Sequence, residues 1–110
     1  MIRVLIILFL FGFTGQVLAQ NQNLALQYYR SKEYSKAVEE LEDVYKKNKS
    51  FQIYDALLDS YQQLKQFDEA EKLIKKQIKI GNGSLLLEID RGHNYYLSGN
   101  ESEAEKIFIN

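Results

Sequence analysis

The stretch at residues 34–38 reads YSKAV, and related stretches follow it at residues 67–71 (FDEAE) and 101–105 (ESEAE). Their alanines, Ala37, Ala70 and Ala104, recur with a period of about 34 residues. Two more columns keep the same spacing, a tyrosine nine positions before each alanine and a large apolar residue four positions after it. They comprise Tyr28, Tyr61 and Tyr95, and Leu41, Ile74 and Phe108. Three coordinated columns at one period predict a repeat protein.

Each repeat has the periodicity of two helices. Around the alanines, at residues 34–49 and 67–79, apolar residues recur every three or four positions, and the charged residues fall on the other side. The segments at 24–29, 51–64 and 85–97 are also helix-like, with apolar residues on more than one side. Since such helices pack between neighbours, the sequence predicts six helices in three antiparallel pairs.

The breaks between these segments contain residues that end and begin helices. Ser50 and Ser84 are predicted N-caps, and Asn100 with Glu103 forms an asparagine version of the capping box. Gly81 and Gly83 are expected to allow the left-handed backbone that ends a helix. On the helix surfaces, two Glu-to-Lys pairs at i,i+4 are expected, Glu42–Lys46 and Glu71–Lys75.

These columns resemble the tetratricopeptide repeat family, whose unit is a pair of helices with a length of about 34 residues. The matching positions of the three units are Leu24, Ala25, Tyr28, Tyr34, Ala37, Leu41 and Val44; Leu57, Tyr61, Phe67, Ala70 and Ile74; and Gly92, Tyr95, Gly99, Ala104 and Phe108. Leu58, Arg91 and Glu101 depart from the family pattern, and its closing proline is absent because the chain contains no proline. The resemblance implies an all-α, right-handed α-solenoid of helix-turn-helix repeats, with about three units and the last one incomplete.

Residues 1–19 have the pattern of a secretory signal peptide. Arg3 precedes an apolar run at residues 4–13, and Val17-Leu18-Ala19 is a small-residue cleavage pattern. The run is shorter than the roughly 20 residues that a spanning helix needs. We therefore expect cleavage and export to the periplasm or cell envelope, with no stable membrane span afterwards; an uncleaved anchor and a buried helix are the alternatives. Residues 20–110 form the repeat domain, with units at about 22–49, 51–82 and 85–110.

Composition excludes several function classes. With 14 basic and 15 acidic residues, the chain lacks the basic excess typical of nucleic-acid binding. The chain has no cysteine, and His93 is its one histidine, so no metal-ligand cluster stands out and no cofactor is predicted. Asp90 precedes His93 by three positions, but no serine elbow accompanies them. The sequence therefore predicts a protein that is not an enzyme.

In the resembled family, the first helix of each pair lines a concave groove that holds extended peptides or partner helices. Carrying those positions over implies a peptide groove at Gln22, Leu26, Tyr29, Arg30, Gln52, Asp55, Asp59, Gln62, Gln63, His93 and Tyr96. Leu86, Ile89 and Leu97 belong to the same positions but are interpreted as packing residues. Such a groove, rich in amides, tyrosines and carboxylates, suits a polar or mildly basic peptide.

These features favour a non-enzymatic protein–protein interaction scaffold or adaptor in the bacterial cell envelope. The alternative is the N-terminal sensing domain of a larger receptor or signalling protein, and a periplasmic hydrolase ranks behind both. Because Ile107, Phe108 and Ile109 stand mid-helix at the last positions, we expect an incomplete solenoid that is marginally stable or self-associates through its C-terminal edge.

Overall fold

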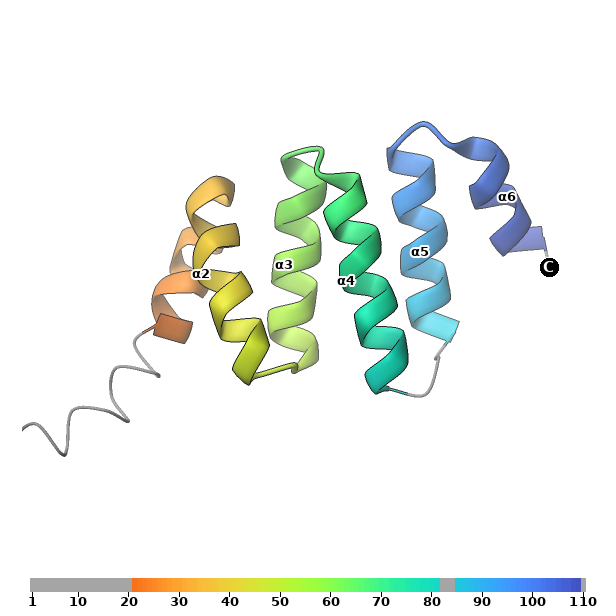
Figure 1. Cartoon of the computed structure of the whole chain (residues 1–110). Helices are drawn as coiled ribbons and strands as arrows, with labels where there is room; N and C mark the ends of the chain where they lie inside the picture. The colour runs from red at the N-terminus through yellow and green to blue at the C-terminus, as the bar shows by residue number, and fades with distance from the viewer. Residues whose placement is uncertain (1–20, 82–84, 110) are drawn as a thin grey trace, which may run out of the picture.

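The computed structural model describes residues 21–81 and 85–109, and these residues form an all-α helical repeat solenoid (Figure 1). A helix covers residues 21–30, and five more follow it: α2 (Tyr34–Lys47), α3 (Phe51–Gln63), α4 (Phe67–Ile80), α5 (Leu85–Leu97) and α6 (Glu101–Ile109). The predicted fold class is confirmed. The predicted signal peptide lies outside the described residues. None of the described helices is long and apolar enough to cross a membrane.

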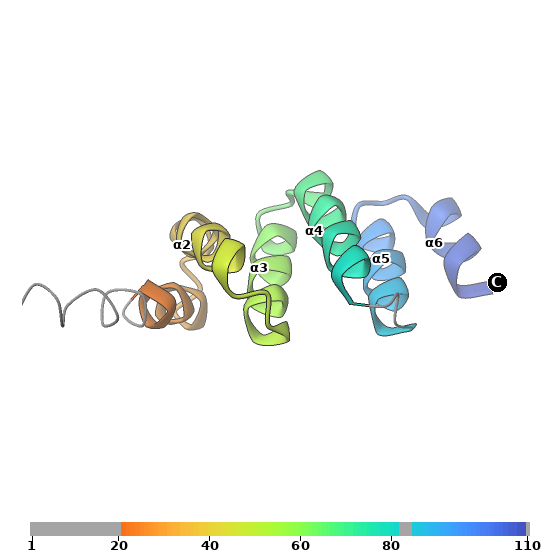
Figure 2. The same ribbon diagram turned by 60° about the horizontal axis from the view of Figure 1, so that its bottom comes forward.

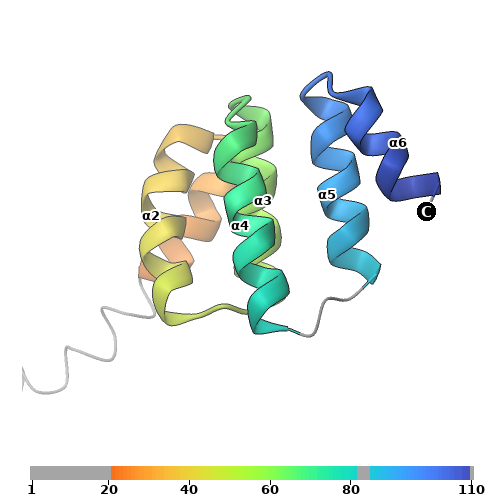
Figure 3. The same cartoon turned by 45° about the vertical axis from the view of Figure 1, so that its right-hand side comes forward.

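The helices form two layers. Figure 2 shows the helix of residues 21–30, α3 and α5 on one side, which we call the first-helix layer, with α2, α4 and α6 on the other, the second-helix layer. Successive helices run antiparallel, and each packs on the next along the row (Figure 3). The principal extents of 69 × 29 × 17 Å describe an elongated body, as expected when each unit contacts only its neighbours.

The turn inside each pair has the same geometry. Lys32, Lys65 and Gly99 have φ angles of 61°, 60° and 85°, so each lies in the left-handed region. The residue after each of them donates its N–H to the carbonyl of the repeat tyrosine, at 2.9, 2.8 and 2.9 Å for Tyr28, Tyr61 and Tyr95. This is a Schellman motif, which satisfies carbonyl groups at the helix end.

This turn explains the spacing of the repeat columns. The residue that donates to the tyrosine carbonyl also begins the next helix, where its own carbonyl accepts the N–H of the repeat alanine. These three bonds are Ala37 to Glu33, Ala70 to Gln66 and Ala104 to Asn100. The donating residue lies five positions after the tyrosine and four before the alanine, which gives the interval of nine between the two columns. The tyrosine and alanine columns are therefore fixed to each other by backbone hydrogen bonds.

The predicted caps have mixed outcomes. Ser50 Oγ accepts the N–H of Ile53 at 3.5 Å, so this N-cap is confirmed, and Asn100 Oδ1 accepts the N–H of Glu103 at 3.4 Å. The carboxylate of Glu103 accepts from Lys106 instead of completing the capping box. Gly81 ends α4 with φ of −122°, so its predicted left-handed conformation is wrong. Ser84 and Gly83 lie outside the described residues.

The core lies between the two layers. Ala37 and Ala70 are fully buried, and this lack of side-chain bulk lets adjacent helices approach closely. Leu41 and Ile74 are 0% exposed, and Tyr54 of α3 is the largest fully buried side chain. In the third unit Gly92 has the same use, because a Cβ there would lie 2.6 Å from Cζ of Phe108.

Two repeat tyrosines join neighbouring units through their hydroxyls. Tyr61 donates to Glu42 Oε1 at 2.6 Å, and Tyr95 donates to Glu71 Oε1 at 2.5 Å. Because Glu42 accepts from Tyr61, the predicted Glu42–Lys46 pair does not form, and Lys46 lies 3.7 Å from Asp43 instead. The predicted pair of Glu71 and Lys75 is confirmed at 3.3 Å.

The bond from Tyr95 makes stability depend on pH. It lowers the pKa of Glu71, with a smaller contribution from Lys75 against the opposing effect of burial. Since the folded pKa lies below the unfolded one, the stabilisation is complete above the unfolded pKa, about 4.3, and is lost as the pH falls through the folded pKa. We expect Tyr95→Phe to lower the free energy of unfolding by about 1 kcal/mol near neutral pH. In urea titrations the difference from the native chain should shrink at pH values below the folded pKa of Glu71; an equal difference at both pH values would contradict this.

Arg91 of α5 occupies the column that holds Leu24 and Leu57 in the other units. Its Nε is buried without a hydrogen-bond partner, while its terminal nitrogens lie 3.9 Å from Glu88 and 3.5 Å from the Tyr95 hydroxyl. A buried unpaired donor costs about 1–3 kcal/mol. We expect Arg91→Leu to raise the free energy of unfolding by about 1 kcal/mol and to raise Tm, as measured by circular dichroism. A lower Tm would show that the guanidinium stabilises the fold.

Candidate functional site

The first-helix layer presents the predicted groove positions. Two hydrogen bonds join α3 to α5: Tyr54 donates to Asp90 at 2.9 Å, and Gln62 Nε2 donates to Asn94 Oδ1 at 3.3 Å. Asn94 is itself buried and donates to the carbonyl of Phe67 at 3.0 Å. These contacts hold α3 and α5 at a fixed spacing, so that the surface between them is preorganised.

A pocket of about 400 Å³ opens between these two helices. Its lining residues are Asp59, Gln62, Gln63, Lys65, Phe67, His93 and Leu97. Four of the predicted groove residues are therefore brought together, three from α3 and His93 from α5. The pocket combines two amides, one carboxylate, one lysine and one histidine with two apolar side chains, a mixture that can receive an amphipathic segment.

Asp59 is held in place from the first unit. Its Oδ2 accepts the hydroxyl of Tyr29 at 2.7 Å, and its Oδ1 accepts Nε2 of Gln63 at 3.3 Å. The bond to Asp59, with burial, raises the pKa of Tyr29 to about 12, so the phenol remains protonated and donates. Tyr29 therefore positions the carboxylate at the pocket and links the first unit to the second.

Asp55 adds a second negative charge one helical turn before Asp59 on α3. Its side chain is exposed, yet partial burial raises the pKa of its carboxyl, and the charge of Asp90 raises it further. Mutual repulsion of this kind is relieved when a cation binds nearby. This end of the face therefore favours basic groups.

The same face of α5 carries a row of exposed apolar side chains. Leu86, Ile89 and Leu97 belong to this row, and Ile89 is 42% exposed. The interpretation of these three as packing residues is not supported, because the described elements leave them exposed. Of the leucines of α5, Leu87 is the one that packs into the core. The first-helix face therefore has a polar part on α3 and an apolar part on α5.

The other predicted groove residues lie elsewhere. Leu26 is buried in the core, and Gln22 accepts a hydrogen bond from Asn48 at 3.3 Å on the side of α2. Tyr96 faces α6, where it lines a separate pocket with Phe108. Arg30 and Gln52 are exposed near the ends of their helices and line none of the pockets described. The spacing of these residues along their helices did not show which side chains face the groove and which face elsewhere.

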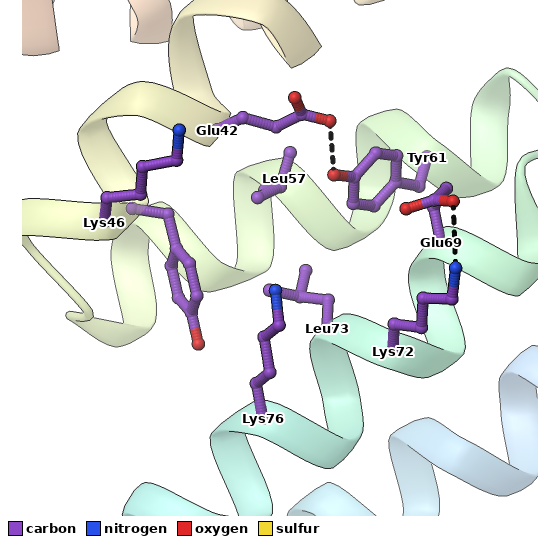
Figure 4. Close-up of a pocket in the computed structure, with 9 residues that line it drawn as sticks. Glu42, Lys46, Leu57, Tyr61, Glu69, Lys72, Leu73 and Lys76 are labelled. Carbon is purple, nitrogen blue, oxygen red and sulfur yellow. Dashed lines mark hydrogen bonds and ion pairs between the residues drawn. The ribbon is translucent and has the colours of Figure 1, made fainter.

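A second pocket, of about 230 Å³, was not predicted. It lies between α2 and α4 over α3, where Leu57 and Leu73 form its apolar floor (Figure 4). Its rim carries both signs of charge, since Glu42 accepts from Tyr61 and Glu69 lies 3.5 Å from Lys72. The ion pair of Glu69 with Lys72 joins neighbouring turns of α4 and was not among the two pairs expected from the sequence. With Lys46, Lys72 and Lys76 against Glu42 and Glu69, the lining of this pocket has one more positive than negative charge.

The first-helix face carries the acidic residue and the histidine that lie three positions apart on α5. Asp90 Oδ2 accepts the hydroxyl of Tyr54 at 2.9 Å. Within residues 21–81 and 85–109, no three histidine or acidic side chains converge as metal ligands would. What the face supplies is hydrogen bonding, negative charge and apolar contact.

Together, the repeated turn, the two layers and the preorganised face define a helical-repeat protein of tetratricopeptide-like fold. No protein-family model matches the sequence, and no curated protein matches it. The chain is similar in structure to the solved protein MamA MSR-1 C2, with a TM-score of 0.71 and 24% sequence identity. The match covers 84% of this chain and 53% of that one, so the chain spans about half the length of MamA. At this identity the likeness shows the fold alone.

Proposed function

We propose that this protein is a non-enzymatic protein–protein interaction scaffold that holds a partner peptide or helix on its first-helix face. The observation that carries the proposal is the pairing of two surfaces across one pocket. The α3 side of the pocket provides Asp59 and two glutamines, and the α5 side provides His93 and Leu97. Outside the pocket, Asp55 continues the α3 side, and the exposed Leu86 and Ile89 continue the α5 side. Tetratricopeptide-like folds suit protein partners, and the similarity to MamA supports the same class.

The partner segment that fits this face is amphipathic. Apolar side chains at helical spacing would cover Leu86 and Ile89, and a lysine or arginine would lie against Asp55 and Asp59. A few well-buried apolar contacts supply most of the affinity in such interfaces, while charge directs the orientation. We therefore expect binding to weaken as salt concentration rises.

We further propose that the scaffold works in the bacterial cell envelope. The support is in the sequence of residues 1–19, with its basic start, short apolar run and small-residue cleavage pattern. Mass spectrometry of the protein recovered from the producing cell should find a chain that begins at Gln20. A chain that keeps residues 1–19 in the cytoplasmic fraction would refute the proposed location.

A matched pair of substitutions tests whether the first-helix face binds the partner. Ile89 on α5 and Ile80 at the end of α4 have similar exposures, 42% and 53%, but only Ile89 lies on the first-helix face. Ile89→Asp should weaken binding of the partner at least about tenfold, because it places a charge in the apolar row. Ile80→Asp should leave binding unchanged.

The measurement is quantitative recovery of proteins from the envelope fraction with each variant, followed by titration of the recovered partner against the purified chains. Equal helical content of the variants by circular dichroism is the folding control. Equal recovery of the same partner with native chain, Ile89→Asp and Ile80→Asp would rule out this face as the binding site.

A further inference from the structure

The C-terminal edge of the described solenoid is an open helix-packing surface. In the first two units, Leu41 and Ile74 are 0% exposed because the next helix of the row covers them. Phe108 occupies the same column on α6 and is 55% exposed. Beside it, Ala104 repeats the small residue that elsewhere lets a helix approach. In the described part of the chain, no helix covers this face of α6.

A hydroxyl–carboxylate bond accompanies the covered surfaces. Where α5 covers α4, Tyr95 donates to Glu71. Glu105 follows Glu71 by one repeat period, so it holds the same repeat position on α6, and its side chain is exposed. The open edge thus offers the carboxylate as well as the apolar column.

The opposite end of the solenoid has the complementary features. Leu24 and Tyr28 occupy the columns of Leu57 and Tyr61, through which α3 packs on the first unit. Leu24 is 37% exposed where Leu57 is 2% exposed. Unlike Tyr61 and Tyr95, Tyr28 donates its hydroxyl to no carboxylate among the described residues. The ammonium of Lys36 lies 5.7 Å from the centre of the Tyr28 ring, so this end also presents a positive charge.

We propose that the two ends bind each other in a second copy of this chain. The helix of residues 21–30 of one molecule covers α6 of the other, as α5 covers α4 within one molecule. Tyr28 then donates to Glu105 as Tyr95 donates to Glu71, with Lys36 near the carboxylate. The contact joins different surfaces of the two copies, so it is head-to-tail and extends the row of repeats by adding chains. It leaves the pocket between α3 and α5 unused and does not depend on the proposed groove function.

A complementation experiment tests the head-to-tail contact. Leu24→Asp damages one end and Phe108→Asp the other, and each variant keeps the opposite end intact. For the protein as recovered from the producing cell, sedimentation velocity should show an average mass that rises with concentration. Each variant alone should be a monomer, with self-association weakened at least about tenfold. A mixture of the two should form a one-to-one dimer, because the intact C-terminal edge of one meets the intact N-terminal edge of the other.

Several results would overturn the proposal. The native chain could be a monomer at every concentration, or the mixed variants could remain monomers. Association of Leu24→Asp at native strength would instead show pairing between two C-terminal edges.

Because Phe108 packs on Gly92, Glu105→Lys serves as a second, exposed substitution at that edge, with Glu39→Lys on α2 as the matched control. Glu105→Lys should weaken association and Glu39→Lys should not; equal behaviour of the two would also overturn the proposal. Circular dichroism verifies that each variant is folded.

Discussion

Truncating Tyr54 to alanine is expected to lower the free energy of unfolding by about 3–5 kcal/mol, as large aromatic-to-alanine changes in a core do. Tyr54 is fully buried in α3, and its hydroxyl donates to Asp90 of the next unit at 2.9 Å. The substitution therefore leaves a cavity in the central unit and also removes the hydrogen-bond donor of a carboxylate. Domains of this size are stable by about 5–15 kcal/mol in all, so much of the helical signal should be lost on warming to physiological temperature.

Phe51 provides the matched control for this substitution. It lies three positions earlier on α3, is exposed, and contacts the ring of Tyr54 edge-on with 6.0 Å between centroids. Phe51→Ala should cost no more than about 1.5 kcal/mol, the value of one aromatic pair. Urea denaturation followed by circular dichroism measures both. If both variants lost the same free energy of unfolding, Tyr54 would not be a central residue of the core.

The second large effect is a gradient of local stability along the row. α6 buries one side chain, that of Ala104, whereas α3 buries seven. Local unfolding of α6 therefore exposes little apolar surface, while opening of α3 separates two units. We expect amide hydrogens of α6 to exchange at least about a hundredfold faster than those of α3, a difference of about 2.7 kcal/mol in opening free energy.

Hydrogen exchange read by mass spectrometry or NMR gives this comparison directly. The protein is diluted until it is a monomer, because association through α6 would protect that helix. Equal protection of α6 and α3 in the monomer would mean that the described residues unfold as one cooperative unit, without the frayed edge expected here.

The fold could be predicted because its repeat columns reflect contacts made in every unit. The interval from Tyr28 to Ala37 is set by backbone hydrogen bonds across one turn, so it recurs wherever the turn recurs. The turn itself was placed correctly, but its left-handed residues were not recognised. Lys32 and Lys65 adopt a conformation that glycine favours, and Gly99 alone carried a sequence signal for it.

The site could be predicted in part. Asp59, Gln62, Gln63 and His93 meet at one pocket because they occupy equivalent positions on neighbouring first helices. Leu26 and Tyr96 shared that spacing but lie in the core and toward α6. Their directions depend on how far each helix is rotated against its neighbours, which one sequence does not specify. The pocket over Leu57 and Leu73 depends on how three helices pack, and no sequence motif predicts it.

The central proposal, that the first-helix face holds a protein partner, is tested most directly by photo-crosslinking in the producing cell. A photoreactive amino acid replaces His93 in one chain and Lys72, on the second-helix layer, in another. We expect a discrete crosslinked partner from position 93 and none from position 72. Adding Ile89→Asp to the first chain should abolish that adduct. An adduct that survives Ile89→Asp, or one that forms equally from position 72, would contradict the proposal.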